Sequence, residues 1–294
     1  MQYGISVPNF GAYFDPRLLA ALARDAEQAG WDGFFLWDHL LGFYPGPVPV
    51  VDPWVALAAI ALATERVRIG PMVTPLPRRR PTKLARETVS VDHLSGGRLT
   101  LGVGIGAMPY EWDYLGEEAD LRVRGAMLDE GLEVLTGLWS AQPFRHVGTH
   151  YHIAGNPPDA EWGAIFGPPP LQTPRIPIWV GGTWPHKAPF RRAARWDGVC
   201  PDGPGRPLAP DEVRDLVAYI DAHRTSAGPF DVVIAGATPG DDAAQAAAIA
   251  GAQAAAGATW WIEGINPWRF GWNYPDPWPV EAMRERIEQG PPKG

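Results

Sequence analysis

The residues best suited to chemistry stand at the end of a short apolar run. Residues 34–37 (Phe-Phe-Leu-Trp) are followed directly by Asp38 and His39. This pattern predicts a buried strand with an acid and an imidazole at its carboxyl end, a pair that can hydrogen-bond a heterocycle or move a proton near neutral pH. Asp is also common in turns after strands, which is the structural alternative. In a barrel of parallel strands the carboxyl ends form the active site, and this favours the functional interpretation.

A glycine-rich segment, residues 102–106, ends another predicted strand. It reads G-x-G-x-G and is followed by Pro109 without a predicted helix start, so it lacks the pattern of a dinucleotide-binding loop. Small residues at a strand end let the backbone approach something flat, and tight packing explains them equally well.

A second segment of this kind, residues 181–183 (Gly-Gly-Thr), follows a strand and precedes a helix that carries Lys187, Arg191 and Arg192. Its amides and hydroxyl could bind a phosphate at the helix N-terminus, with the basic residues adding positive charge. The alternative is a glycine turn before a solvated basic helix.

Two other clusters could bind charged ligands. Residues 78–80 (Arg-Arg-Arg) and Lys83 would suit the anionic tail of a cofactor or substrate, although a charge run more often forms a solvated face. His146, His150 and His152 invite a metal interpretation, but no cysteine or acid cluster completes a ligand set. We therefore predict no metal, and a metal-dependent hydrolase is the weakest alternative.

The chain as a whole alternates between strands and helices. Predicted strands cover residues 3–7, 34–37, 67–73, 99–104, 178–181, 199–200, 232–235 and 259–262. Predicted helices cover residues 16–29, 53–63, 81–95, 121–139 and 187–195, and others begin at 211, 242 and 280. Eight such units predict an α/β fold of the (β/α)8 TIM-barrel type, with a doubly wound sheet as the main alternative.

The alternation breaks between the fourth helix and the fifth strand. Residues 143–175 contain an expected hairpin around Gly148 and a loop rich in Pro and Gly. A loop of this length in a compact domain is usually functional or disordered, and we expect an insertion that acts as a lid over the site. Since no change in composition divides the chain, residues 1–294 are predicted to form one domain.

Composition argues against several classes of protein. The chain has 294 residues, a formal net charge of −8 and one cysteine, Cys200. Net acidity argues against non-specific nucleic-acid binding, and a single cysteine cannot form an internal disulfide, which suggests a reducing, cytoplasmic setting. No apolar run is long enough to span a membrane, and the N-terminus lacks the pattern of a signal peptide.

Aromatic side chains are frequent in the predicted loops. Six of them are Tyr110, Trp112, Trp162, Trp184, Trp268 and Trp272. They could line an apolar pocket, which suggests a largely apolar or aromatic substrate, and ordinary loop packing is the alternative.

Several motifs together resemble the bacterial-luciferase-like family of flavin and deazaflavin oxidoreductases. They include Trp-Asp-His at 37–39, Leu-Ser-Gly-Gly-Arg at 94–98 before a glycine-ended strand, and Trp-Val-Gly-Gly at 179–182. Further similar segments are 3–9, 66–70 and 73–75, so that the resemblance extends over residues 1–262. The motif at 94–98 is the most specific of them.

The resemblance implies a cofactor site at the carboxyl end of the barrel. His39 corresponds to the family histidine, and Asp38 beside it would contact the cofactor ring or relay a proton. Met72 and Val73 correspond to a bulge with an unusual peptide bond, whose backbone supports the ring.

Five further residues follow from the same resemblance. Gly104 and Gly106 would let the cofactor ring approach the backbone. Gly181, Gly182 and Thr183 lie where members of the family hold a phosphate. The segment 143–175 matches a variable insertion that shapes the substrate entrance.

The implied cofactor is coenzyme F420, with FMN as the alternative. The order Asp38-His39 is similar to the F420-using branch, and an arginine that FMN members place after the fourth strand would fall at Ile105. The sugar-phosphate dehydrogenases of the F420 branch carry a glutamate where this chain has Ala107 and a tryptophan where it has Phe43. A sugar phosphate is therefore not the expected substrate.

We expect an oxidoreductase that transfers hydride between F420 and a small organic substrate, with His39 handling a proton. Two alternatives stay open: a two-component monooxygenase that uses reduced FMN and dioxygen, and a non-catalytic flavin-binding barrel. The resemblance also implies a homodimer and, as a partner, a flavin or F420 reductase. No nucleic-acid or membrane partner is expected.

Overall fold

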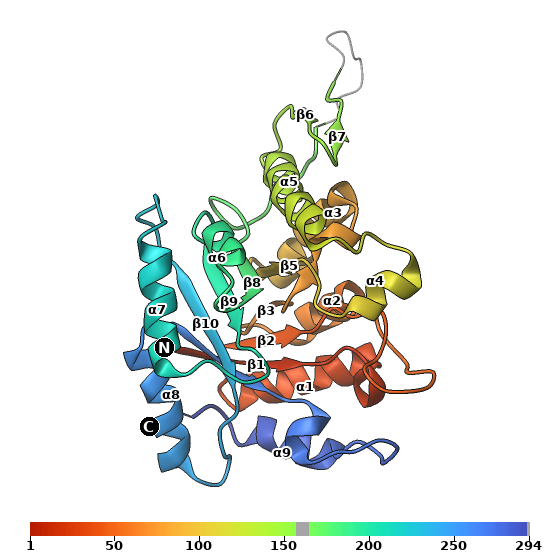
Figure 1. Cartoon of the computed structure of the whole chain (residues 1–294). Helices are drawn as coiled ribbons and strands as arrows, with labels where there is room; N and C mark the ends of the chain where they lie inside the picture. Colours follow the sequence, from red (N-terminus) through yellow and green to blue (C-terminus); the bar gives the residue numbers. More distant parts are fainter. Residues whose placement is uncertain (157–164, 293–294) are drawn as a thin grey trace.

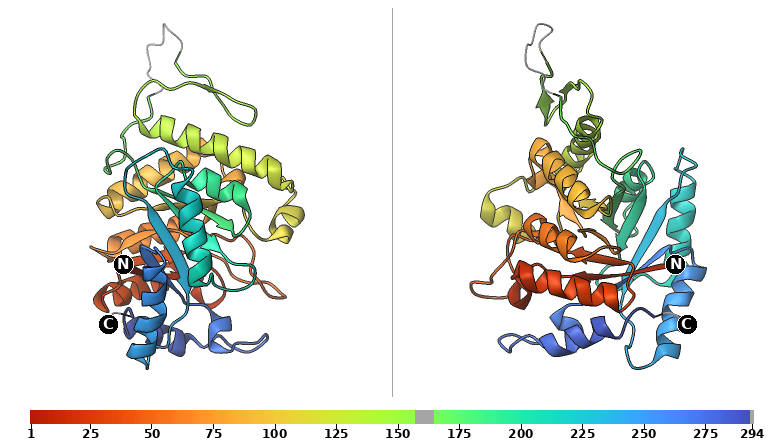
Figure 2. Two further views of the ribbon diagram at one scale, coloured as in Figure 1. Left: turned by 60° about the vertical axis from the view of Figure 1, so that its left-hand side comes forward. Right: turned by 180° about the vertical axis from the view of Figure 1, so that it is seen from behind.

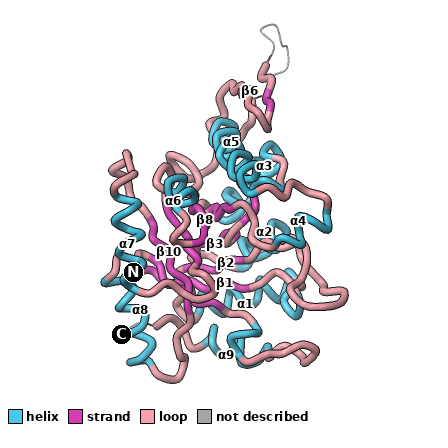
Figure 3. The backbone as a smooth tube through the Cα atoms, viewed as in Figure 1, coloured by secondary structure: helices cyan, strands magenta, loops and turns pink. Residues whose placement is uncertain are grey.

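Parallel strands form a barrel at the centre of the molecule (Figures 1 and 3). The computed structural model describes residues 1–156 and 165–292. The strands are β1 (Gln2–Val7), β2 (Gly33–Leu36), β3 (Arg68–Pro71), β4 (Thr74–Pro75), β5 (Leu101–Gly104), β8 (Ile178–Thr183), β9 (Gly198–Asp202), β10 (Asp231–Gly236) and β11 (Trp260–Gly264). They lie in the order β3-β2-β1-β11-β10-β9-β8-β5-β4, and β3 meets the start of β5 at a parallel bridge between Ile69 and Leu99. The sheet is therefore nearly closed, which confirms the predicted TIM-like barrel.

Helices cover the outside of this barrel (Figure 2). They are α1 (Pro16–Gln28), α2 (Pro53–Ala63), α3 (Pro81–Ser95), α5 (Leu121–Trp139), α6 (Lys187–Ala193), α7 (Pro210–Asp221), α8 (Ala243–Ala255) and α9 (Val280–Glu288). An Asp side chain caps the first turn of α1, α2 and α5, and a proline opens α1 and α2, as the sequence indicates. Short 3-10 helices, η1 (Gly11–Tyr13), η2 (Leu76–Arg78) and η3 (Pro267–Phe270), follow β1, β4 and β11. In the described part of the chain, no helix is both long and apolar enough to cross a lipid bilayer.

Large side chains fill the barrel interior. Phe35, Trp179 and Trp260 are buried there, with ring centroids 5.3 to 5.9 Å apart. Met72 and Cys200 pack against this layer and are only partly buried, so they mark its upper surface toward the carboxyl ends of the strands. Because the centre is a packed core, a ligand must bind beyond it, at the carboxyl end.

Two segments differ from the sequence-based expectations. Pro109 opens a helix, α4 (Pro109–Leu115), where none was expected. Gly182 and Thr183 do not form a loop before a helix, because they continue β8 and pair with β9 as far as Asp202. Glycine is typical of turns in a sequence, but parallel pairing with β9 keeps these two residues extended.

The motif at 94–98 has a structural explanation. α3 ends at Gly96 in the left-handed conformation, with φ +68°. Arg98 then donates hydrogen bonds to the carbonyl oxygens of Ala61, Thr64 and Val67, which end α2 and lead into β3. The motif therefore joins the ends of two helices and sets the start of β5.

The segment 143–175 lies beside α3 and α5 as far as it is described. Its hairpin forms from β6 (His146–Val147) and β7 (His152–Ile153), and Glu130 of α5 accepts hydrogen bonds from the amides of 149–151. Residues 157–164, with Trp162, lie outside the described residues. After them, Asp92 of α3 accepts hydrogen bonds from Gln172. These contacts involve the outer helices, and the role of a lid stays a prediction.

Candidate active site

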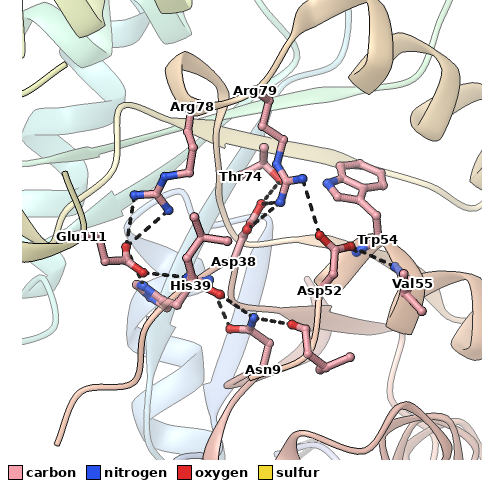
Figure 4. A network of polar contacts seen from close by, with 12 residues as sticks. Asn9, Asp38, His39, Asp52, Trp54, Val55, Thr74, Arg78, Arg79 and Glu111 are labelled. Carbon is pink, nitrogen blue, oxygen red and sulfur yellow. Dashed lines mark hydrogen bonds and ion pairs between the residues drawn. The ribbon is translucent and has the colours of Figure 1, made fainter. Parts of the chain in front are cut away.

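Asp38 lies two residues after β2, at the carboxyl end of the barrel (Figure 4). It is buried, and Arg79 Nη2 donates to both of its carboxylate oxygens at 2.8 Å, while Thr74 Oγ1 donates at 2.8 Å. Burial alone would lower the pKa of Arg79, but the charge and hydrogen bonds of Asp38, together with the charges of Asp52 and Glu87, raise that pKa. Asp38 therefore anchors the segment after β4, and a direct role toward a cofactor stays a prediction.

His39 is held through both its backbone and its side chain. Asn9, just after β1, donates to the carbonyl oxygen of His39 at 2.9 Å and accepts from its amide at 3.2 Å. The imidazole Nδ1 lies 3.3 Å from Glu111 Oε2. In the described residues Nε2 has no hydrogen-bond partner, and the side chain keeps 16% of its surface. His39 thus presents Nε2 while the rest of the residue is fixed.

Glu111 of α4 orients His39. Its Oε1 accepts hydrogen bonds from the amides of Leu40 and Leu41 at 2.7 and 3.0 Å, and its Oε2 lies 3.4 Å from Arg78 Nη2. Burial alone would raise the pKa of Glu111, but His39, the amides and Arg78 together lower it to about 2. Glu111 is therefore a carboxylate at neutral pH. A carboxylate at this distance requires a proton on Nδ1 of His39, so Nε2 is the acceptor in the neutral ring.

Glu111 was missed in the sequence. The family resemblance directs attention to Ala107, and no helix was expected after Pro109. The available signal was a proline followed by an acidic residue, which is a helix-start pattern. Glu111 lies in the first turn of α4, and its carboxylate contacts His39.

A buried stack supports α4. The guanidinium carbons of Arg78 and Arg124 lie 4.5 and 4.0 Å from the ring centroid of Trp112, which is 1% exposed. Gly106 has φ +83°, and a Cβ there would lie 2.2 Å from the Trp112 indole. Packing therefore explains Gly106, and its expected role in cofactor approach stays a prediction.

Substituting Gly106→Ala should destabilise the protein. The left-handed φ and the overlap with Trp112 together should lower the free energy of unfolding by about 2–4 kcal/mol, measured by urea denaturation. Gly116→Ala is the matched control, because Gly116 has φ +67° but no heavy atom within 4 Å of an added Cβ. An equal loss of unfolding free energy in the two variants would show that the overlap of the added Cβ with Trp112 does not destabilise the protein.

Met72 and Val73 form a half-exposed apolar platform next to the end of β2. Their peptide bond is cis, at the position where the resemblance implies an unusual one. The Met72 amide donates to β2 at 2.6 Å, which places the platform next to the strand that leads to His39. Cβ atoms at Gly104 and Gly181 would lie 2.8 and 3.3 Å from Val73, so these glycines make room for it. Such a surface fits a flat heterocycle, and support of a cofactor ring stays a prediction.

The segment expected to hold a phosphate is less open than the sequence suggests. A Cβ at Gly182 would lie 2.3 Å from Pro189, so this glycine allows α6 to pack. Asp202 lies beside Thr183 in the register of β8 and β9. Although Asp202 is accessible to solvent, the surrounding protein removes enough water to raise the pKa of its carboxyl group. An ionised acid here would oppose a phosphate, and the expected contact stays a prediction.

Other charged side chains are engaged in structural contacts. Arg78 and Arg79 keep 4% and 15% of their side-chain surface and pair with acids. Arg80 and Lys83 of the same cluster are exposed, and the expected contact with an anionic tail stays a prediction. Arg192 pairs with Asp129 at 2.7 Å. His146 Nε2 lies 3.1 Å from Glu130, and no group of three or more His, Cys, Asp or Glu is placed to hold a metal within residues 1–156 and 165–292.

The aromatic residues expected to line a pocket divide into two groups. Trp112, Trp184 and Trp272 are buried and serve packing. Tyr110 donates to a loop carbonyl at 3.3 Å, and Trp268 on η3 keeps 39% of its surface. Trp268 is therefore the one of these five that offers a large open ring at this end of the barrel.

Comparison with known proteins agrees with this architecture. The family model described as luciferase-like monooxygenase matches residues 1–288. The F420-dependent glucose-6-phosphate dehydrogenase of Beutenbergia cavernae is 34% identical over 200 residues, which cover 66% of this chain and 55% of that protein. The match thus spans about half the length of this relative.

Two solved structures share the fold with different cofactors. An F420-dependent secondary alcohol dehydrogenase in complex with an F420-acetone adduct superposes with a TM-score of 0.77 at 18% identity, covering 99% of this chain and 98% of the other. The oxygenating constituent of 3,6-diketocamphane monooxygenase from Pseudomonas putida, in complex with FMN, gives 0.65 at 22% identity, covering 81% and 67%. At these identities the likeness shows the fold.

Proposed function

Because the chain belongs to the luciferase-like monooxygenase family, we propose that it is an oxidoreductase that transfers hydride between F420 and a small alcohol or the corresponding carbonyl compound. The observation that carries this proposal is the pair of His39 and Glu111, at 3.3 Å. Removal of a hydride from an alcohol carbon also requires removal of the hydroxyl proton. A histidine with a fixed Nδ1–H and an open Nε2 is suited to accept it.

The residues around His39 fit a flat cofactor ring in part. Met72 and Val73 would support one face of the ring, and Gly104 and Gly181 keep Val73 in place beneath it. When bound, F420 supplies the ring carbon that accepts or releases the hydride. Thr183 would contact the cofactor tail. Asp202, which lies beside it, would oppose a phosphate there if its carboxyl group were ionised.

The chain's own residues would manage the proton. In alcohol oxidation, His39 Nε2 accepts the hydroxyl proton, and the carboxylate of Glu111 stabilises the resulting imidazolium through Nδ1. In the reverse direction the same nitrogen donates a proton to the carbonyl oxygen. Asn9 holds the backbone of His39, so the ring keeps one orientation in both directions.

The comparisons support F420 over FMN. A structure that matches over nearly the whole chain is that of an F420-dependent alcohol dehydrogenase, and a curated relative at 34% identity is F420-dependent by name. The FMN-containing structure matches a smaller share of both chains. An FMN-dependent monooxygenase is therefore the alternative outcome of the test below.

The test is a fluorescence titration of the cofactor-free protein with F420 and, separately, with oxidised and reduced FMN. We expect F420 to bind at least about tenfold more tightly than FMN, a difference of roughly 1.4 kcal/mol. Tighter binding of reduced FMN would contradict the proposal and favour oxygen-dependent chemistry. Binding of neither compound would also overturn it.

A further inference from the structure

A cluster of aromatic rings borders His39. Trp37, Phe43 and Trp268 come from the loops after β2 and β11, and we call these three residues the aromatic wall. The rings of Trp37 and Trp268 are parallel within 4°, with centroids 6.5 Å apart, and the Phe43 centroid lies 5.9 and 6.0 Å from them. Three loop side chains thus form one continuous apolar surface.

The aromatic wall is supported from behind. Phe10 is fully buried and lies 5.1 Å from Phe43 and 6.3 Å from Trp268, measured between centroids. Trp278 in turn packs edge-on against Phe10 at 5.8 Å. Trp37 and Phe43 are partly exposed, and Trp268 is 39% exposed. Packing against Phe10 therefore holds the aromatic wall in place, and part of the surface of its three rings remains accessible to solvent.

The wall reaches the proton-handling group. The imidazole of His39 lies edge-on to Phe43 with centroids 4.3 Å apart, and it lies 6.0 Å from Trp37. A flat apolar group resting on the wall would therefore place an attached oxygen within reach of Nε2. The catalytic group and the apolar surface form a single site.

Charges near the wall disfavour a phosphorylated substrate. Arg269 on η3, next to Trp268 in sequence, pairs with buried Glu263 at 2.6 Å and donates to two backbone carbonyls. Arg79 pairs with Asp38. Among the described residues, each of these arginines is matched by an acid, so neither offers a free charge to a phosphate.

We propose that the aromatic wall is the substrate subsite and that it takes an uncharged secondary alcohol or ketone that carries a flat aromatic ring. The reaction part of this inference rests on the proposed function, whereas the binding part does not. The inference also excludes sugar phosphates, the substrates that the names of the curated dehydrogenase relatives specify.

The test measures the binding of 1-phenylethanol, propan-2-ol and glucose 6-phosphate to the cofactor-free protein by ligand-observed NMR. We expect 1-phenylethanol to bind and Trp268→Ala to weaken that binding by about tenfold, since stacking and burial on one ring account for roughly that factor. Trp268→Phe should retain most of the affinity. Tyr114→Ala is the matched control, because Tyr114 is 78% exposed on α4 and is not part of the wall.

Each outcome has a defined meaning. Absence of 1-phenylethanol binding, equal binding by Trp268→Ala and the wild type, or tighter binding of glucose 6-phosphate would each overturn the inference. With F420 present, Trp268→Ala should raise KM for 1-phenylethanol with little change in kcat or in the KM for propan-2-ol. If Trp268→Ala turns over both alcohols with the KM of the wild type, the aromatic wall is not the substrate subsite, but the proposed function stands. If 1-phenylethanol binds and Trp268→Ala weakens that binding, but F420 is not turned over, the subsite stands and the proposed function is wrong.

Discussion

Replacing His39 with alanine should lower turnover with F420 and a secondary alcohol by about 10²- to 10⁴-fold, the usual contribution of a positioned general base. The hydroxyl proton then has no acceptor at the place where Nε2 stands. Cofactor binding should change little, because the platform of Met72 and Val73 does not depend on the imidazole. Steady-state kcat, compared with F420 affinity from titration, measures the two effects separately.

His223→Ala is the matched control for this substitution, since His223 lies two residues beyond α7 and its imidazole contacts Tyr219, which belongs to that helix. It should keep wild-type turnover. Full activity in His39→Ala would exclude His39 as the base. Loss of every activity together with F420 binding would instead indicate a structural role for the histidine.

Glu111→Gln should lower kcat by about 10²-fold while His39 itself remains. A neutral amide can donate to Nδ1, which permits the tautomer with the proton on Nε2 and removes the charge that stabilises the imidazolium. Nitrogen-15 NMR of the histidines reports the tautomer directly. Glu117→Gln is the control, because Glu117 also pairs with Arg78, at 2.9 Å, but is not bonded to His39. Wild-type kcat in Glu111→Gln, or an equal loss in both variants, would refute the assigned role.

Glu111 should also make stability depend on pH. Its pKa in the folded protein, about 2, lies below the ordinary value for a glutamate, so its stabilisation is fully present above that ordinary value and is lost as pH falls toward 2. The contribution at neutral pH is roughly 3 kcal/mol. Unfolding measured between pH 5 and pH 2, as a rough window, should therefore show a smaller loss of stability in Glu111→Gln than in the wild type.

Local sequence signals determined much of the fold. α2 and α5 have the bounds expected from sequence, because α2 is a continuous apolar run and the apolar residues of α5 recur at helical spacing. The four buried apolar residues of β2 form the expected strand, which ends at Leu36, two residues before Asp38. The cis peptide bond between Met72 and Val73 was expected from the family resemblance alone, because no local sequence pattern predicts it.

Contacts between distant segments limited the prediction of the site. Glu111 meets His39 across 72 residues, and Arg79 meets Asp38 across 41. A run of arginines gives no sign of its partners, so a solvated or ligand-binding face was the natural interpretation. Gly182 likewise read as a turn, although it makes room for Pro189 of α6. These pairings follow from the closed barrel, which brings the strand ends together, and not from neighbouring residues.

The most direct test of the central claim is anaerobic mixing of the protein with F420 and a panel of uncharged secondary alcohols, followed by the loss of F420 fluorescence. We expect the wild type to reduce F420 with at least one alcohol of the panel and His39→Ala to show no loss over the same time. Unchanged fluorescence of F420 across the whole panel would contradict hydride transfer to F420 as the function of this site.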